Sequence, residues 1–235
     1  MRLSPLFLIA ALAACEPVVV DDAPQAPPIQ VVDAGPQVSQ AQAVRNFRRA
    51  AERIEPMAEG VCRRRDPRVN CDFNIVIDNR SQQINAYQTV DPSGRPIIAF
   101  TVPMIGEARN VDEIAFVMAH EAAHHIEGHL ARQQTNATVG ALVLGGLAGA
   151  LGTADQATLD TAQQLGAGLG ARTYSKNFEL EADALGTRIA HAAGFDPLRG
   201  AQFFFRIPDP GDRFLGTHPA NADRLRTVQR VAAGL

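Results

Sequence analysis

The chain has 235 residues, of which 46% are hydrophobic and 20% are charged, and its formal net charge at pH 7 is −3. This composition excludes a wholly disordered chain and suits one domain with a full hydrophobic core. The charge is weakly negative and there is no basic patch interleaved with aromatic residues, so nucleic acid is not expected as a partner.

The first residues have the pattern of a bacterial export signal. Arg2 precedes the apolar segment 6–14, which is too short to span a bilayer. The segment ends in Leu12-Ala13-Ala14-Cys15, which resembles a lipobox. We therefore predict a signal peptide over residues 1–14 and lipidation of Cys15, whose acyl chains would anchor the protein to a membrane. An ordinary secretory signal with an incidental cysteine is the alternative.

The residues after Cys15 predict both a location and a tether. Glu16, rather than Asp, follows the lipidated position, which resembles lipoproteins of the outer membrane of a Gram-negative cell that face the periplasm. Residues 15–38 are rich in proline, alanine and glutamine and are predicted to be a flexible tether. Residues 39–235 are predicted to form one folded domain.

The two remaining cysteines agree with an oxidising compartment. Cys62 and Cys71 flank a charged loop between a predicted helix over 39–59 and a predicted strand over 73–77. A disulfide between them is the natural reading for a periplasmic protein and would stabilise the domain by about 2–4 kcal/mol. Two free buried thiols are the alternative.

Two further strands and a long helix follow. Residues 84–88 and 97–101 are predicted to pair as strands around the turn at 91–94. The next segment, 111–131, is apolar on nearly every side, which indicates a buried helix. Its start is marked by Asn110 as the cap and by Glu113 three residues later, as in a capping box.

This helix carries the most informative motif of the chain, His120-Glu121-Ala122-Ala123-His124. Residues four apart lie on the same face of a helix, so that two imidazoles at this spacing can bind one metal ion. The glutamate between them can take a proton from a water on that ion. This is the His-Glu-x-x-His pattern of zinc metallopeptidases. A surface helix with polar histidines is the alternative, which the buried setting disfavours.

A catalytic zinc ion needs a third protein ligand. Leu130 stands where metzincins have their third histidine, and His129 is one residue out of register, so the metzincin class is excluded. A later predicted helix offers Glu179 as the ligand and, one turn on, Asp183 to accept the ring N–H of a ligand histidine. An acidic helix face in water is the alternative for both.

The rest of the domain is predicted to be helical. The apolar, glycine-rich run 137–151 is expected to form a buried or loop-capping hairpin near the site, with contact to a membrane as the alternative. The remaining helices are predicted at 156–168, 176–193, 197–206 and 219–232. The other histidines, His125, His129 and His191, and also Glu181, are predicted to have structural or surface roles.

Several segments together resemble one family. They are Ile84-Asn85-Ala86-Tyr87, Arg95 to Thr101, Asp112 to His124 with His129, Tyr174 to Gly186, and Thr217-His218-Pro219 with Arg224. Their order and combination resemble the gluzincin peptidases that include the CaaX prenyl-protein proteases, the HtpX-type proteases and the BepA- and LoiP-type periplasmic proteases. The resemblance covers residues 40–232.

The resemblance implies a site and a fold. One Zn²⁺ per chain would be bound by His120, His124 and Glu179, with Glu121 as the catalytic base and Asp183 beside the site. His218 would lie near the active site. The alternative is that His218 only belongs to the cap region before the last helix. The implied fold is α+β, a mostly helical zincin-like metalloprotease domain with a small β-sheet and an active-site helix.

The implied function is that of a lipid-anchored periplasmic zinc endopeptidase that hydrolyses unfolded or misassembled envelope proteins. An extended substrate would add a strand to the sheet edge around 84–88 or 97–101. A chaperone or scaffold of outer-membrane protein assembly, with a structural or self-inhibited zinc site, is the alternative. A membrane-surface interaction module, acting through Cys15 and residues 137–151, is a second alternative.

Overall fold

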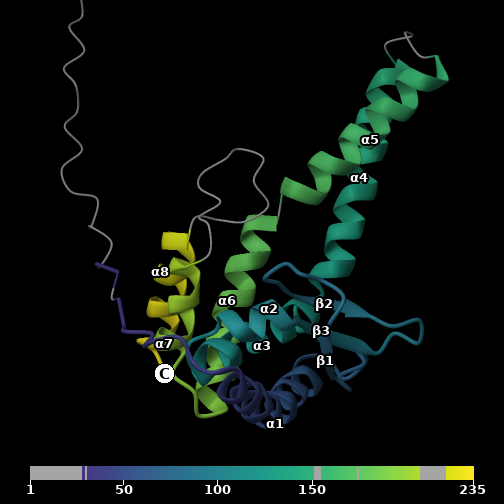
Figure 1. Ribbon diagram of the computed structural model, residues 1–235. Coiled ribbons are helices and arrows are strands. Elements are labelled where there is room, and N and C mark those ends of the chain that lie inside the picture. Colours follow the sequence, from purple (N-terminus) through teal and green to yellow (C-terminus); the bar gives the residue numbers. More distant parts are fainter. Residues whose placement is uncertain (1–27, 30, 151–154, 174, 207–220) are drawn as a thin grey trace, which may run out of the picture.

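The computed structural model describes residues 28–29, 31–150, 155–173, 175–206 and 221–235 (Figure 1). Helices dominate the described part and three short strands form one sheet, so the predicted mostly helical α+β class is confirmed. The elements in chain order are α1 (Gln40–Arg65), β1 (Asn74–Asp78), β2 (Ala86–Val90), β3 (Pro96–Thr101), α2 (Val102–Glu107), α3 (Val111–Ile126), α4 (His129–Ala150), α5 (Gln156–Thr173), α6 (Ser175–Ala192), α7 (Pro197–Gly200), the 3₁₀ helix η1 (Ala201–Phe205) and α8 (Asn221–Ala232).

The sheet has the strand order β1-β3-β2. The predicted hairpin is present, because β2 and β3 pair antiparallel with Ala86 opposite Phe100. In the turn between them, the Gly94 N–H donates to the Asp91 carbonyl at 2.9 Å. β1 pairs parallel with the other side of β3, so β3 is the central strand. Of the two strands predicted as a substrate edge, only β2 lies at an edge.

Helix α1 packs mainly against α3 and is longer than predicted. Its N-cap Ser39 accepts a hydrogen bond from the Gln42 N–H, and the helix continues to Arg65 with three arginines in its last turn, where a positive charge is favourable. Phe47 packs edge-on against Phe100 of β3, with ring centroids 5.5 Å apart. The predicted disulfide joins Cys62 near the end of α1 to Cys71 just before β1.

Helix α3 lies in the centre of the domain and ends earlier than predicted. The predicted helix 111–131 is divided into two, because the chain leaves α3 after Ile126 and turns at Gly128, whose φ is +66°. Glycine adopts this left-handed backbone conformation without the steric cost that other residues have. A new helix, α4, then begins at His129 and takes a different direction (Figure 1).

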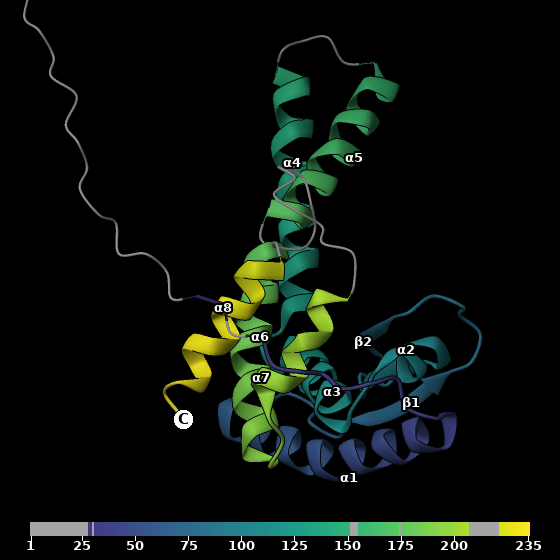
Figure 2. The ribbon, with the colours of Figure 1, turned by 60° about the vertical axis from the view of Figure 1, so that its left-hand side comes forward.

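The prediction that the hairpin at 137–151 is buried is wrong. Helices α4 and α5 pack against each other and project from the rest of the domain (Figures 1 and 2). Val139, Leu142, Val143 and Leu147 are each more than half exposed. An apolar, glycine-rich run predicts close helix contact but not what covers its outer face. Within the described ranges, none of the helices combines the length and the apolar character needed to cross a membrane.

The described end of the predicted tether lies against the domain. Residues 28–29 and 31–38 form neither helix nor strand. Ala34 is buried, and its carbonyl accepts a hydrogen bond from the Asn110 side chain at 2.9 Å. Gln37 donates to the Gly106 carbonyl at 2.6 Å. These two contacts attach the segment before α1 to α2 and to the start of α3.

The C-terminal helices follow the prediction with changed bounds. α6 begins and ends within one residue of the predicted 176–193, and α5 is five residues longer than the predicted 156–168. The predicted helix 197–206 is a single turn, α7, capped by Asp196 and followed by η1. Of the predicted 219–232, residues 221–232 are described and form α8.

Candidate metal centre

Helix α3 holds the motif in a rigid, buried setting. As predicted, Asn110 caps the helix and accepts the Glu113 N–H at 2.9 Å. The Glu113 carboxylate accepts the Arg109 N–H at 2.8 Å and pairs with Arg206, which satisfies a fully buried acidic group. Apolar residues surround the helix on almost every side, so the motif histidines are fixed by packing rather than held on a surface.

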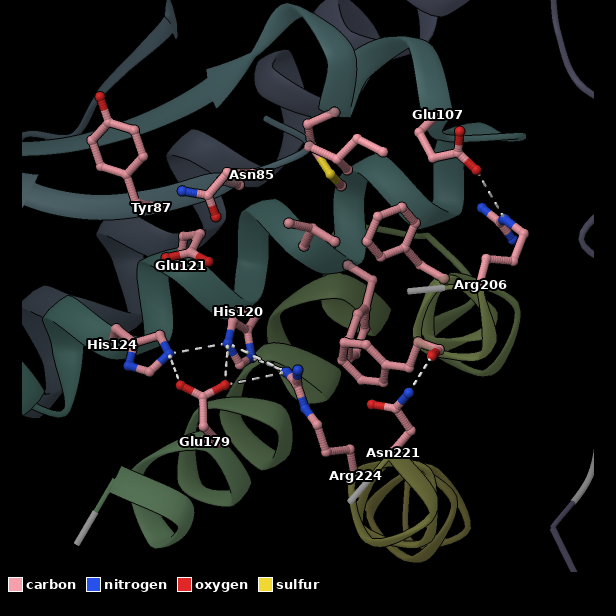
Figure 3. Close-up of a pocket in the computed structure, with 17 residues that line it drawn as sticks. Asn85, Tyr87, Glu107, His120, Glu121, His124, Glu179, Arg206, Asn221 and Arg224 are labelled. Atoms are coloured by element: carbon pink, nitrogen blue, oxygen red, sulfur yellow. Dashed lines mark hydrogen bonds and ion pairs between the residues drawn. The ribbon is translucent and has the colours of Figure 1, made fainter. Parts of the chain in front are cut away.

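Helix α6 approaches α3 closely enough to bring acidic groups to the histidines. A Cβ atom added at Gly186 would lie 3.0 Å from the backbone nitrogen of His120, so only glycine permits this helix spacing without displacement. Glu179 and Asp183, one turn apart on α6, both face α3 here, and Figure 3 shows Glu179 next to the two histidines. The acidic helix face in water, which was the alternative, does not describe these residues, because both are buried.

The three predicted ligands, His120, His124 and Glu179, converge on one point. The Nε2 atoms of His120 and His124 are 3.0 Å apart, and the Glu179 carboxylate oxygens lie 3.5 Å and 3.3 Å from them (Figure 3). Ligand atoms about 2.0–2.1 Å from a tetrahedral zinc ion lie about 3.3 Å from one another. The set of two imidazole nitrogens and one carboxylate is also a donor set that zinc prefers. The residues present therefore fit a zinc ion.

His120 is supported by a buried ion pair. Its Nδ1 lies 2.9 Å from Asp183 Oδ1, and Arg224 of α8 donates to both oxygens of Asp183 at 2.8 Å and 2.7 Å. Burial alone would raise the pKa of Asp183, but the guanidinium beside it holds that pKa below its usual value. The Arg224 guanidinium also lies 3.6 Å from the ring centroid of Phe204.

The same groups act on the protonation of His120. Burial opposes the charged ring, but its hydrogen bonds with Asp183 and Glu179 outweigh this and raise the pKa of His120 to about 9. A metal ion and a proton compete for the same Nε2 lone pair, so binding of a metal at this site releases a proton below that pH.

His124 is supported by a longer chain of groups. Its Nδ1 lies 2.9 Å from Nδ1 of His129, and Nε2 of His129 lies 3.1 Å from Glu181 Oε2. Arg132 donates to the same oxygen of Glu181 at 2.6 Å. Desolvation by burial lowers the pKa of His129 to about 4, so its ring is neutral near pH 7. The sequence alone predicts only structural or surface roles for His129 and Glu181.

Glu121 lies in a cavity beside this site. The cavity has a volume of about 560 Å³ and is lined by Glu121 and all three converging residues. Four consecutive residues, Ile84–Tyr87, line its opposite wall. Ile84 and Asn85 immediately precede β2, and Ala86 and Tyr87 are its first two residues, so the beginning of this edge strand borders the cavity. Glu121 lies between the histidines and Asn85 (Figure 3).

The other predicted site residues are less informative. His218 and Cys15 lie outside the described residues. His125 points away from the cluster, with its Nε2 2.8 Å from the Asn70 carbonyl oxygen, and His191 is exposed. Two groups that sequence reasoning missed are Arg224, whose late Arg position was noted without a role, and His129, whose only signal was its place just after the motif.

Comparisons with known proteins point to one family. Residues 45–232 match peptidase family M48. Beta-barrel assembly-enhancing proteases of Escherichia coli O157:H7 and of Escherichia coli K12 are 36% and 35% identical to the chain over an alignment of 136 residues, and the match covers 52% of this chain and 28% of each relative. The protein of that name from Yersinia pestis is 31% identical over 145 residues, with the same shares. The match thus spans little more than a quarter of these relatives.

Proposed function

The chain belongs to peptidase family M48, and we propose that it is a zinc-dependent endopeptidase of the cell envelope. The proposed zinc ligands are His120, His124 and Glu179, and the proposed catalytic base is Glu121. The observation that carries the proposal is the convergence of the three ligand atoms, all within 4.8 Å of one another, at the wall of a cavity that also contains Glu121.

The proposed chemistry divides between the ion and the chain. When bound, zinc supplies a Lewis acid that polarises the scissile carbonyl and lowers the pKa of a water molecule to about 7. Glu121 takes a proton from the attacking water and returns it to the amine that leaves. Its place in the cavity, on the turn of α3 between the two histidines, supports both transfers.

The substrate is proposed to bind in an extended conformation along β2. This strand is an edge strand, and residues 84–87 face the cavity beside the histidines. A peptide that adds to a sheet edge is bound through main-chain hydrogen bonds, which any unfolded segment offers. Loose sequence preference suits a quality-control protease that acts on unfolded or misassembled envelope proteins. The names of the relatives add assembly of β-barrel proteins as the process in which such substrates arise.

The proposed location is the periplasmic side of the outer membrane, with the chain anchored through lipidated Cys15. Two observations support this location. The disulfide between Cys62 and Cys71 is typical of an oxidising compartment. The relatives named above are from Gram-negative bacteria.

The direct test is Glu121→Gln in the purified protein. This change keeps the size of the side chain and a polar group but removes the base. We expect zinc content to remain at one ion per chain and cleavage of unfolded casein to fall by a factor of about 10²–10⁴, the typical contribution of a general base. Zinc is measured by elemental analysis and cleavage by the release of peptides.

Glu52→Gln is the matched control, because Glu52 is an exposed glutamate on α1 away from the cavity. It should retain both zinc and activity. Casein cleavage by Glu121→Gln at the rate of the parent would contradict the proposed mechanism. A parent protein that binds zinc but cleaves no unfolded substrate, while it improves assembly of outer-membrane proteins, would favour the chaperone alternative.

A further inference from the structure

The ligand His124 is bonded on its far side to a second histidine. His129 is the first residue of α4, and its Nδ1 lies 2.9 Å from Nδ1 of His124. The other ring nitrogen of His129 lies 3.1 Å from Glu181 Oε2, and Arg132 holds that carboxylate with a 2.6 Å hydrogen bond. Three side chains thus link His124 to the boundary between α4 and α6.

The direction of these hydrogen bonds follows from the chemistry at the outer end. A carboxylate paired with an arginine only accepts hydrogen bonds, so His129 Nε2 must carry a hydrogen and donate to Glu181. A neutral imidazole has one donor and one acceptor, which leaves Nδ1 of His129 as an acceptor. His124 Nδ1 must then donate to it. Its Nε2 is left with a free lone pair, and this is the atom that faces His120 and Glu179.

The ring of His129 is fixed in the orientation that this chain requires. It is 4% exposed and stacks on Phe178 of α6, with ring centroids 4.6 Å apart and an angle of 11° between the planes. Arg132 lies over the same phenyl ring, at 4.3 Å from its centroid. Since α6 also supplies Glu179 and Glu181, one helix positions the third ligand and the support of the second.

We propose that His129 is a positioning residue that holds His124 in its metal-binding tautomer, with Glu181 and Arg132 fixing the tautomer of His129 in turn. The inference rests on the proposed zinc site. Partners of this kind orient a ligand histidine and raise its basicity, and their loss typically weakens metal affinity about 10- to 100-fold.

The first test measures zinc affinity in competition with a chelator of known strength. His129→Phe keeps an aromatic ring for stacking on Phe178 but removes both nitrogens, and we expect it to weaken zinc binding about 10- to 100-fold. His129→Asn can place an amide oxygen where Nδ1 lies, so it should recover most of that loss. His191→Phe, which removes an exposed histidine, is the matched control and should bind zinc as the parent does.

The second test needs no variant at His129 and therefore does not depend on whether one folds. The ¹⁵N chemical shifts of the ring nitrogens in the zinc-loaded parent report where each proton lies. We expect the hydrogen of His129 on Nε2 and that of His124 on Nδ1. A hydrogen on Nδ1 of His129 would overturn the inference, as would parental zinc affinity in His129→Phe. A parent that binds no zinc would instead overturn the proposed function, so the two failures are distinct.

Discussion

Each of the two histidines of the site is supported by its own series of side chains, which we call an arm. The first arm supports His120 and is buried, whereas the second supports His124 and ends in exposed side chains. On the first arm, His120 reaches a carboxylate directly, and the pair Asp183–Arg224 is almost completely buried. On the second arm, His124 reaches its carboxylate through His129, and the side chains of Glu181 and Arg132 are 39% and 45% exposed. Both arms end in a carboxylate held by an arginine.

This difference separates two roles that one residue often combines, namely support of the fold and support of the metal site. Removal of one partner of a buried ion pair leaves an uncompensated charge in the core, whereas exposed pairs contribute little to stability because water and salt screen them. The first arm is therefore expected to support both the fold and the metal. The second arm is expected to support the metal while the fold depends on it only slightly.

The largest effect is expected from Asp183→Ala on the first arm. It removes the carboxylate that accepts both close hydrogen bonds of the buried Arg224 guanidinium and leaves only the longer ion pair with Glu179 at 3.6 Å. Loss of one partner of a buried pair typically costs about 3–5 kcal/mol of stability. It also removes the hydrogen-bond acceptor of His120. Urea unfolding of the metal-free variant measures the first effect and chelator competition the second. An exposed ion pair contributes roughly 1 kcal/mol at most. An unfolding free energy within that margin of the parent would contradict the expected difference between the two arms.

Glu181→Ala on the second arm is expected to separate the two effects. The unfolding free energy of the metal-free protein should fall by only about 0–1 kcal/mol, since the pair with Arg132 is exposed. Zinc affinity should still fall about 10-fold, because His129 loses the acceptor that fixes its tautomer. Urea unfolding measures the change in stability and chelator competition measures the change in zinc affinity. A loss of stability as large as that of Asp183→Ala would show that the second arm is as structural as the first.

The smallest effect is expected from Arg132→Ala, and salt should modulate it. The arginine neutralises Glu181 but does not itself touch either ligand histidine. We expect zinc affinity to fall by a factor of about 2–5 in low salt, which corresponds to about 0.4–1 kcal/mol for an exposed pair. Because salt screens exposed charges, the difference from the parent should shrink in 1 M NaCl. A difference that salt leaves unchanged would indicate a packing role on Phe178.

Much of the site was readable from local sequence because it depends on helix geometry. The spacing of His120 and His124 places two imidazoles on one helix face wherever the helix lies. The cap at Asn110 and the hairpin turn at 91–94 are likewise set by neighbouring residues, and both were predicted. The third converging group, Glu179, was found through its own helical pairing with Asp183, although its approach to the histidines needs the close packing of α6 on α3.

The exposure of the α4–α5 hairpin could not be predicted from local sequence. An apolar run with several glycines is compatible with a core helix and with a projecting hairpin, because polarity does not report what packs on the outer face. In the structure each helix packs mainly on the other, and large apolar side chains such as Leu142 stay exposed.

The sequence by itself determined the buried motif helix, the class of fold and three of the groups that converge, because these depend on composition and on short periodic spacings. Only the tertiary structure decided the position of His129 beside His124. In the single helix predicted over 111–131, residue 129 would lie about 140° around the helix from residue 124, away from the metal ligands. The turn at Gly128 ends that helix and returns His129 beside His124, where two nitrogens meet at 2.9 Å.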